Sequence, residues 1–255
     1  MYTAGISIFA VYLGIGILLF SIQRSFIYFP SEAVQHSFEE AEFDNKGTQI
    51  RTVLVNSGKK HAILYFGGNA ESVASSAPEF QEQFPSHSVY LVNYRGYGGS
   101  EGKPDEVGLF SDALYIYDDL LTSYDSVSII GRSLGSGVAS YVASERSVDK
   151  LVLVTPFDSL QNVAQKRFPV YPMSLLCKDK YDSLGRAQDI HSDVLILAAE
   201  NDEIIALSHT KNLVKSFVNE NSNFIVIDKA QHNDISLYGP YYEAITHFLK
   251  APEGE

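Results

Sequence analysis

Cysteine is nearly absent from this sequence: Cys177 is the single thiol among 255 residues. No intramolecular disulfide can form, so the fold does not depend on an oxidising compartment. The chain has no CxxC pair and no HExxH stretch, which are the usual sequence signatures of a metal site. We therefore expect neither a metal nor another cofactor, and we expect Cys177 to act as a small buried apolar residue.

Positive charge is scarce as well, since 19 Lys and Arg residues face 31 Asp and Glu residues, a formal net charge of -12. A nucleic-acid-binding protein normally presents a basic surface to phosphate, and this chain would repel it. Hydrophobic residues make up 45% of the sequence, which at this length supports a substantial core. The composition predicts an acidic globular protein without a nucleic-acid partner.

Charge is missing altogether from residues 3–22, TAGISIFAVYLGIGILLFSI. About 20 helical residues span a hydrocarbon core of about 30 Å. A cleaved signal peptide would need a positive N-terminal region and a small-residue cleavage site, and neither is present; a buried core helix is the other alternative. We predict a single transmembrane anchor at 3–22. Arg24, which follows it, favours a cytoplasmic location for the rest of the chain.

From Ser31 onward, short apolar runs rich in β-branched residues alternate with helical patterns. The runs are 50–56, 61–68, 88–96, 126–131, 150–157, 193–200 and 223–230, and the helical patterns are 71–84, 109–124, 134–145, 207–218 and 240–249. This alternation predicts an α/β fold with a mostly parallel sheet and helices on both faces. Residues 158–190 contain Pro169, Pro172 and Gly185 but no clear strand, so we expect a small cap inserted in a domain covering 31–250.

Ser133 lies in the pattern Gly131-Arg132-Ser133-Leu134-Gly135, between a predicted strand and a predicted helix. This G-x-S-x-G pattern places a serine nucleophile on a strained turn, where neighbouring side chains must be small. A glycine-rich turn without chemistry is an alternative, as is a phosphate-binding loop, although G-x-x-x-x-G-K-[ST] is absent. The pattern makes Ser133 a candidate nucleophile.

A serine nucleophile needs a base, and the base needs an orienting acid; in this type of fold they follow in the order Ser, Asp or Glu, His. His232 is the one histidine between the last predicted strand and the last helix. Asp202 follows the preceding strand, with Glu200 and Glu203 as rivals. We predict His232 as the base and Asp202 as the acid.

An oxyanion intermediate requires two backbone N–H donors. Leu134, directly after the nucleophile, supplies one, and the loop after the strand 61–68 supplies the other. We predict the Asn69 N–H group for this role, with Ala70 and Gly68 as rivals.

Several segments together resemble the alpha/beta-hydrolase superfamily, and more narrowly its Bem46-like, membrane-anchored branch. They run from 64 to 235 and are YFGGNAES, VNYRGYGGSEG, IIGRSLGSGVA, LVTPFDSLQNVA, YPMSLLCKDKYDS, AENDEIIALSHT and AQHNDI. The resemblance implies an alpha/beta-hydrolase fold and a serine hydrolase with Ser133 as nucleophile, Asp202 as acid, His232 as base, and the Asn69 and Leu134 N–H groups as the oxyanion hole. The chain departs from the family in Gly67, where a histidine is usual.

The predicted activity is hydrolysis of carboxylic esters or thioesters, of lipids or acylated proteins, at a membrane. A serine peptidase of the same fold is one alternative, because a triad does not choose between ester and amide. A catalytically silent, membrane-tethered interaction protein is the other. The choice of substrate is expected to depend on the cap at 158–190.

Overall fold

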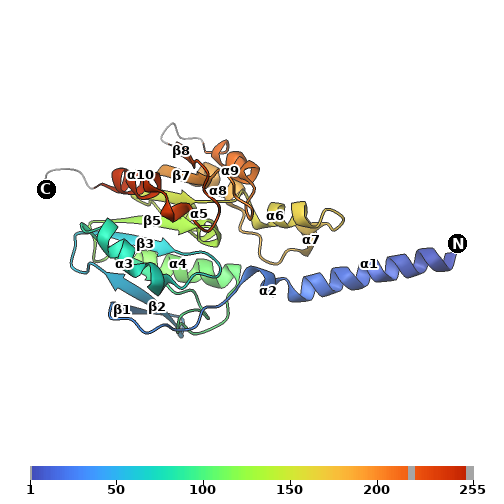
Figure 1. Ribbon diagram of the computed structural model, residues 1–255. Helices are drawn as coiled ribbons and strands as arrows, with labels where there is room; N and C mark the ends of the chain where they lie inside the picture. The colour runs from blue at the N-terminus through green and yellow to red at the C-terminus, as the bar shows by residue number, and fades with distance from the viewer. Residues whose placement is uncertain (1, 218–221, 251–255) are drawn as a thin grey trace.

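The computed structural model describes residues 2–217 and 222–250, and it consists of a body with one long helix leading away from it (Figure 1). This helix, α1 (Tyr2–Ile22), contains the predicted anchor. By length and composition its stretch Gly5–Ile22 could cross a membrane, with a mean hydropathy of 2.3. Only 6% of that stretch is buried, unlike the core helix of a soluble protein.

The body contains one sheet of eight strands in the order β1-β2-β4-β3-β5-β6-β7-β8. The strands are β1 (Glu39–Asn45), β2 (Thr48–Val55), β3 (His61–Phe66), β4 (His87–Val92), β5 (Ser126–Arg132), β6 (Lys150–Val154), β7 (Asp193–Ala199) and β8 (Ser222–Ile227). Strands β3 to β8 pair in parallel, whereas β1 and β2 join at one edge by antiparallel pairing. The fold is the predicted α/β architecture with a mostly parallel sheet.

Helices cover both faces of this sheet (Figure 1). Besides α1, the described helices are α2 (Arg24–Ile27), α3 (Val73–Gln83), α4 (Glu106–Leu120), α5 (Leu134–Glu145), α6 (Leu160–Arg167), α7 (Met173–Leu176), α8 (Ser183–Arg186), α9 (Leu207–Val214), α10 (Gly239–Leu249) and the 3₁₀ helices η1 (Ala187–Asp189) and η2 (Ile235–Leu237). Neighbouring strand residues such as Ile129 and Ile130 belong to two different cores. Helices α4, α5 and α9 bury one core, and α3 and α10 bury the other, so the central strands need apolar side chains on both faces.

The sequence patterns missed strand β1, whose seven residues EEAEFDN include four carboxylates. It lies at the sheet edge, pairs with β2, and buries only Phe43 and Asn45. An edge strand needs no continuous apolar run, and charged side chains protect it from further pairing. The other strands and long helices lie where they were predicted, although residue 218, the end of the predicted helix 207–218, lies outside the described residues.

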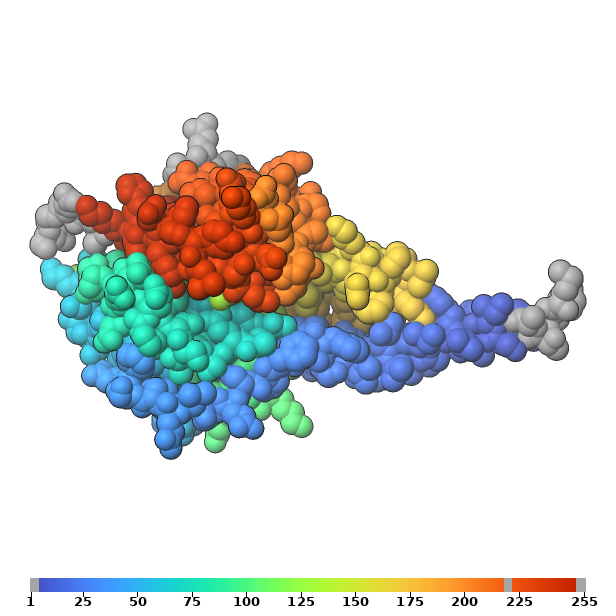
Figure 2. Space-filling view, in the orientation of Figure 1, coloured from blue at the N-terminus to red at the C-terminus, as the bar shows by residue number. Residues whose placement is uncertain are grey.

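The segment predicted as a cap, 158–190, contains α6, α7, α8 and η1 and has no strand among its residues, all of which are described. Its two halves pack differently. Helices α6 and α7 project toward α1 (Figure 2), whereas Tyr181, Ala187 and Ile190 belong to the core beneath α5. Within the predicted cap, the projecting part is therefore limited to about 160–177, and the rest of the cap packs against the body.

Candidate active site

The turn that carries Ser133 is sterically constrained. Ser133 separates β5 from α5 with φ 51° and ψ -115°, a conformation that a non-glycine residue rarely adopts. A Cβ atom on Gly135 would collide with the carbonyl oxygen of Phe66. One on Gly131 would collide with the carbonyl oxygen of Gly135 and lie 2.6 Å from Ala139 Cβ. The expectation that the two glycines avoid such collisions is confirmed.

The side chains of Ser133, His232 and Asp202 form a hydrogen-bonded chain. His232 Nε2 lies 2.9 Å from Ser133 Oγ, and His232 Nδ1 lies 2.8 Å from Asp202 Oδ2. The three residues follow β5, β8 and β7, so they meet at the carboxyl ends of parallel strands, where ligands bind in open α/β sheets. The His232 and Asp202 side chains are 5% and 3% exposed, so the hydrogen bond between them is shielded from water.

Asp202 is held by its own loop, and the two rival carboxylates point elsewhere. Its Oδ1 accepts the N–H groups of Ile204 at 2.9 Å and Ile205 at 2.6 Å, which leaves Oδ2 for the imidazole. Glu203 accepts the backbone N–H of His232 at 3.3 Å, and Glu200 accepts that of Lys229 at 2.8 Å. Of the three predicted acids, Asp202 is the one that contacts the imidazole ring.

The loop after β3 lies beside the candidate nucleophile. Asn69, Ala70 and Leu134 line the same cavity as Ser133. Among the rivals for the second oxyanion donor, the Gly68 N–H is already engaged, because it donates to Glu71 Oε2 at 2.9 Å. The Asn69 carbonyl accepts from the Tyr97 hydroxyl at 2.9 Å, which orients the peptide group that carries the Ala70 N–H. The geometry leaves Asn69 and Ala70 as candidates on this loop.

Glu71 and Arg132 organise this loop, and the sequence interpretation gave neither of them a role. The Glu71 carboxylate accepts from the Tyr65 hydroxyl at 2.8 Å, from the Gly68 N–H and from Ser76 Oγ at 2.9 Å. Burial, with a contribution from Glu71, raises the pKa of Tyr65 well above its ordinary value, so the hydroxyl keeps the proton that it donates. Glu71 lies three residues after Gly68 in the sequence. Only the folded loop brings its carboxylate to the Tyr65 hydroxyl.

Arg132 connects the two loops of the site. Its guanidinium lies 3.9 Å from Glu71 and donates to the carbonyl oxygens of His232 and Asn233, each at 3.3 Å. Burial lowers the pKa of Arg132, but Tyr65 and Glu71 raise it more, so the group stays charged. The residue before the nucleophile therefore ties the loop after β3 to the loop that carries the histidine.

The candidate active site opens into a cavity of about 490 Å3, a size typical of small-molecule sites. Ser133 and His232 line it. Its lining also has an apolar part, which consists of Phe26 and Ile27 of α2, Leu160 and Val163 of α6, and Ile204. The place of Phe26 in the wall of this cavity was not predicted from the sequence.

Within residues 2–217 and 222–250, no group of three or more His, Cys, Asp or Glu side chains is arranged to hold a metal ion. Cys177 is half-buried and lies outside the Ser133 cavity.

Comparison with known proteins agrees with this fold and identifies its family. A family model described as the alpha/beta hydrolase fold matches residues 62–176. An uncharacterized protein of Mycobacterium tuberculosis is 30% identical over 257 residues, covering 92% of this chain and 90% of that protein. An uncharacterized membrane protein of Saccharomyces cerevisiae is 34% identical over 179 residues, covering 67% of this chain and 63% of that protein.

Among solved structures, an esterase from Pyrococcus furiosus superimposes with a TM-score of 0.71 at 17% identity, covering 88% of this chain and 97% of the esterase. The chain belongs to the alpha/beta-hydrolase superfamily. Within that superfamily its relatives place it in the Bem46-like branch.

Proposed function

We propose that this protein is a membrane-anchored serine hydrolase that cleaves carboxylic esters or thioesters. The hydrogen-bonded chain from Ser133 through His232 to Asp202, with distances of 2.9 and 2.8 Å, is the observation that carries the proposal. Acyl transfer through a covalent intermediate requires this arrangement of three residues. Ser133 and His232 line a cavity of suitable size for a substrate.

In the first half of the reaction, Ser133 Oγ attacks the carbonyl carbon while His232 Nε2 takes the hydroxyl proton. The Nδ1 proton then faces Asp202, whose charge holds the ring and stabilises the imidazolium. The N–H groups of Asn69 and Leu134 stabilise the oxyanion. Collapse of the tetrahedral intermediate breaks the bond to the alcohol or thiol, which leaves with the proton from His232, and an acyl-serine ester remains.

In the second half, water attacks the acyl-serine ester. His232 takes a proton from this water and returns it to Ser133 Oγ as the ester breaks, so a carboxylic acid leaves and the enzyme is restored. No cofactor takes part in either half. The same three residues would attack an amide, and a serine peptidase is therefore the alternative activity within this fold.

Part of the cavity lining is apolar and includes Ile27, Leu160 and Val163. This lining favours the acyl chains of lipids or acylated proteins as substrates. We infer that residues 3–22 anchor the protein as a single membrane span, since α1 is long, apolar and almost unburied and the yeast relative is named a membrane protein. We assign the catalytic domain, 31–250 with its cap at 158–190, to the cytoplasmic side on the basis of Arg24.

Labelling with a fluorophosphonate probe tests the proposed nucleophile. We expect the wild type to be labelled and Ser133→Ala to be unlabelled. Ser144→Ala is the control. It removes a hydroxyl from α5, the helix that follows Ser133, where Ser144 Oγ donates to the Tyr141 carbonyl, and the variant should be labelled like the wild type. A wild type without label, or equal labelling of Ser133→Ala, would contradict the enzyme assignment and favour the silent interaction protein.

One panel of substrates separates the hydrolase activities. Esters of nitrophenol, acyl thioesters, lysophospholipids and peptides would be compared with the same preparation, with Ser133→Ala as the blank. We expect the highest kcat/KM among esters or thioesters, and a preference for peptides would replace the proposed activity with the peptidase.

A further inference from the structure

A second cavity lies next to the Ser133 cavity. It has a volume of about 420 Å3 and lies between the last turn of α1, the short helix α2 and the cap helices α6 and α7. The two cavities share five lining residues, all of them apolar: Phe26, Ile27, Leu160, Val163 and Ile204. Beyond these shared walls, Phe20, Ala164 and Leu176 extend the apolar lining away from Ser133. The two cavities therefore adjoin at these side chains, and together they reach from the candidate nucleophile to the end of α1; we refer to the two as the path.

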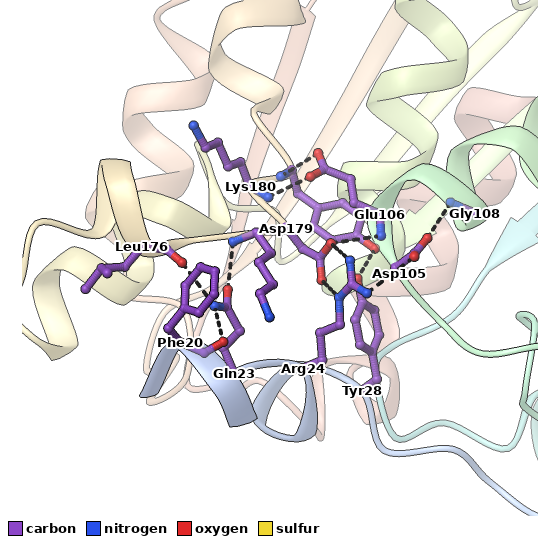
Figure 3. Close-up of polar contacts among 12 residues, drawn as sticks. Phe20, Gln23, Arg24, Tyr28, Asp105, Glu106, Gly108, Leu176, Asp179 and Lys180 are labelled. Atoms are coloured by element: carbon purple, nitrogen blue, oxygen red, sulfur yellow. Dashed lines mark hydrogen bonds and ion pairs between the residues drawn. The ribbon is translucent and has the colours of Figure 1, made fainter. Parts of the chain in front are cut away.

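One wall of this path is the juxtamembrane segment, residues 23–29, which polar contacts fix against the cap (Figure 3). The Arg24 guanidinium donates two hydrogen bonds to the Asp179 carboxylate, at 2.8 and 3.0 Å, and lies 3.4 Å from Asp105. The Asp179 side chain is only 2% exposed. Bidentate pairing of this kind fixes direction as well as distance, and it sets the position of α2 relative to the cap.

Gln23 adds a second attachment one residue earlier (Figure 3). Its side-chain amide donates to the Leu176 carbonyl at 3.0 Å and accepts the Lys178 N–H at 2.7 Å. On the other side of Arg24, the hydroxyls of Tyr28 and Tyr181 are 2.8 Å apart in the interior. The segment that follows the anchor is thus built into the domain over its length, and it is more than a linker.

Leu19 and Phe20 of α1 line the second cavity, and the cap contacts α1 again further along the helix. Tyr12, in the middle of α1, stacks on Tyr171 with ring centroids 4.6 Å apart, and its hydroxyl donates to the Val170 carbonyl at 2.9 Å. The neighbouring cap side chains Val170 and Leu175 are 70% and 79% exposed. If α1 spans a bilayer, Val170 lies at the depth of its hydrocarbon, because its carbonyl binds Tyr12 in the middle of α1. Figure 2 shows the segment of α6 and α7 lying along the helix.

We propose that this second cavity is the binding site for the acyl chain of the substrate and sets chain-length preference. The acyl chain enters from the bilayer beside α1 and runs between the juxtamembrane segment and the cap. Its carbonyl carbon then lies at Ser133. The proposal rests on the hydrolase function proposed above. Each methylene buried along the path would raise kcat/KM by up to about four-fold, which corresponds to about 0.8 kcal/mol.

Ala164 offers a direct test because it lines the second cavity and not the first. We would reconstitute the full-length protein in lipid nanodiscs and measure kcat/KM with nitrophenyl butyrate and nitrophenyl dodecanoate. For Ala164→Trp we expect the butyrate value to stay within about two-fold of the wild type and the dodecanoate value to fall more than ten-fold. Lys166→Trp places the same indole on an exposed position of α6 outside both cavities and should change neither value.

Ala164→Leu fills less of the cavity, carries less risk of misfolding, and should give an intermediate loss on dodecanoate alone. Unchanged chain-length preference in both Ala164 variants, with a normal butyrate rate, would overturn the acyl-site proposal and leave the hydrolase intact. A different result would overturn the proposed hydrolase function itself: Ser133→Ala would retain the wild-type rate on butyrate.

Discussion

At the scale of single residues, Glu71 is the side chain whose importance is visible only in the structure. Its carboxylate is 13% exposed and accepts donors from a strand, a loop and a helix, namely Tyr65, Gly68 and Ser76. These bonds hold the loop on which the Asn69 N–H is proposed to act. Glu71 touches no proposed reacting atom, and we assign it as a positioning residue.

Replacing Glu71 by Gln should lower kcat on nitrophenyl butyrate by about ten- to a hundred-fold while KM changes little, because a displaced oxyanion donor affects mainly the transition state. Gln loses one acceptor oxygen and the charge beside Arg132. Steady-state kinetics would measure the change, with thermal unfolding as a check on the fold.

Glu79→Gln is the matched control, since Glu79 is an exposed residue of α3 that accepts a hydrogen bond from the Gln83 side chain in an i, i+4 pair. It should keep the wild-type kcat. If Glu71→Gln lowered the melting temperature but left kcat unchanged, the role of Glu71 would be purely structural.

The main candidate residues were accessible from the sequence because each follows a recognisable strand. Ser133, Asp202 and His232 come after β5, β7 and β8, and parallel strands bring such positions together. Their chemical roles stay predictions. Arg95, outside the candidate site, forms an ion pair with Asp112 at 2.6 Å.

At the scale of elements, the segment of α1 and α2 has two features: an apolar run and contacts with the cap. The sequence predicts only the first. The apolar run predicts the helix, because twenty uncharged residues carry the signal locally. The attachment of Gln23 and Arg24 to residues 176–179 spans about 150 positions, and no periodicity records it. The element that would tether the protein also shapes its second cavity.

Removing residues 1–22 should release a soluble domain that retains the juxtamembrane segment and still hydrolyses short esters. The contacts of Gln23, Arg24 and Tyr28 with the cap survive this deletion, whereas the stacking of Tyr12 on Tyr171 is lost. Carbonate extraction of membranes followed by sedimentation, with esterase activity in each fraction, would measure the outcome.

The full-length chain is the control for this deletion and should remain in the carbonate-washed membrane pellet. Recovery of the full-length chain in the soluble fraction would refute membrane attachment. A soluble fragment without activity toward butyrate would show that α1 itself is needed to assemble the catalytic cavity.

At the scale of the whole molecule, stability depends on pH through a buried histidine remote from the candidate active site. His87 begins β4 and is 5% exposed. Burial, with a smaller contribution from His61, lowers its pKa from 6.5 to about 4. Between these values the unfolded chain binds a proton that the folded protein refuses, so stability is complete above pH 6.5 and is lost as the pH falls toward 4.

At pH 5 this effect amounts to about 2 kcal/mol, or a fall in melting temperature of about 4–8 °C relative to pH 7.5. His87→Gln cannot take up the proton and should lose this part of the pH dependence. Thermal unfolding of the full-length protein in detergent at both pH values would measure it.

His191→Gln is the control, because His191 is exposed, and it should keep the wild-type difference between pH 7.5 and pH 5. An equal difference in His87→Gln and the wild type would show that His87 does not cause the loss.

The sequence alone determined the alternation of strands and helices, the apolar helix at 3–22, and the candidates Ser133 and His232 with a short list of acids between them. These features depend on local periodicity and on short motifs, and both are written in consecutive residues. Only the tertiary structure decided which acidic residue faces His232, how Glu71 and Arg132 join two loops, and how residues 23–29 wall a second cavity. Those features depend on contacts between segments up to 155 residues apart, and such contacts exist only once the sheet has brought its carboxyl ends together.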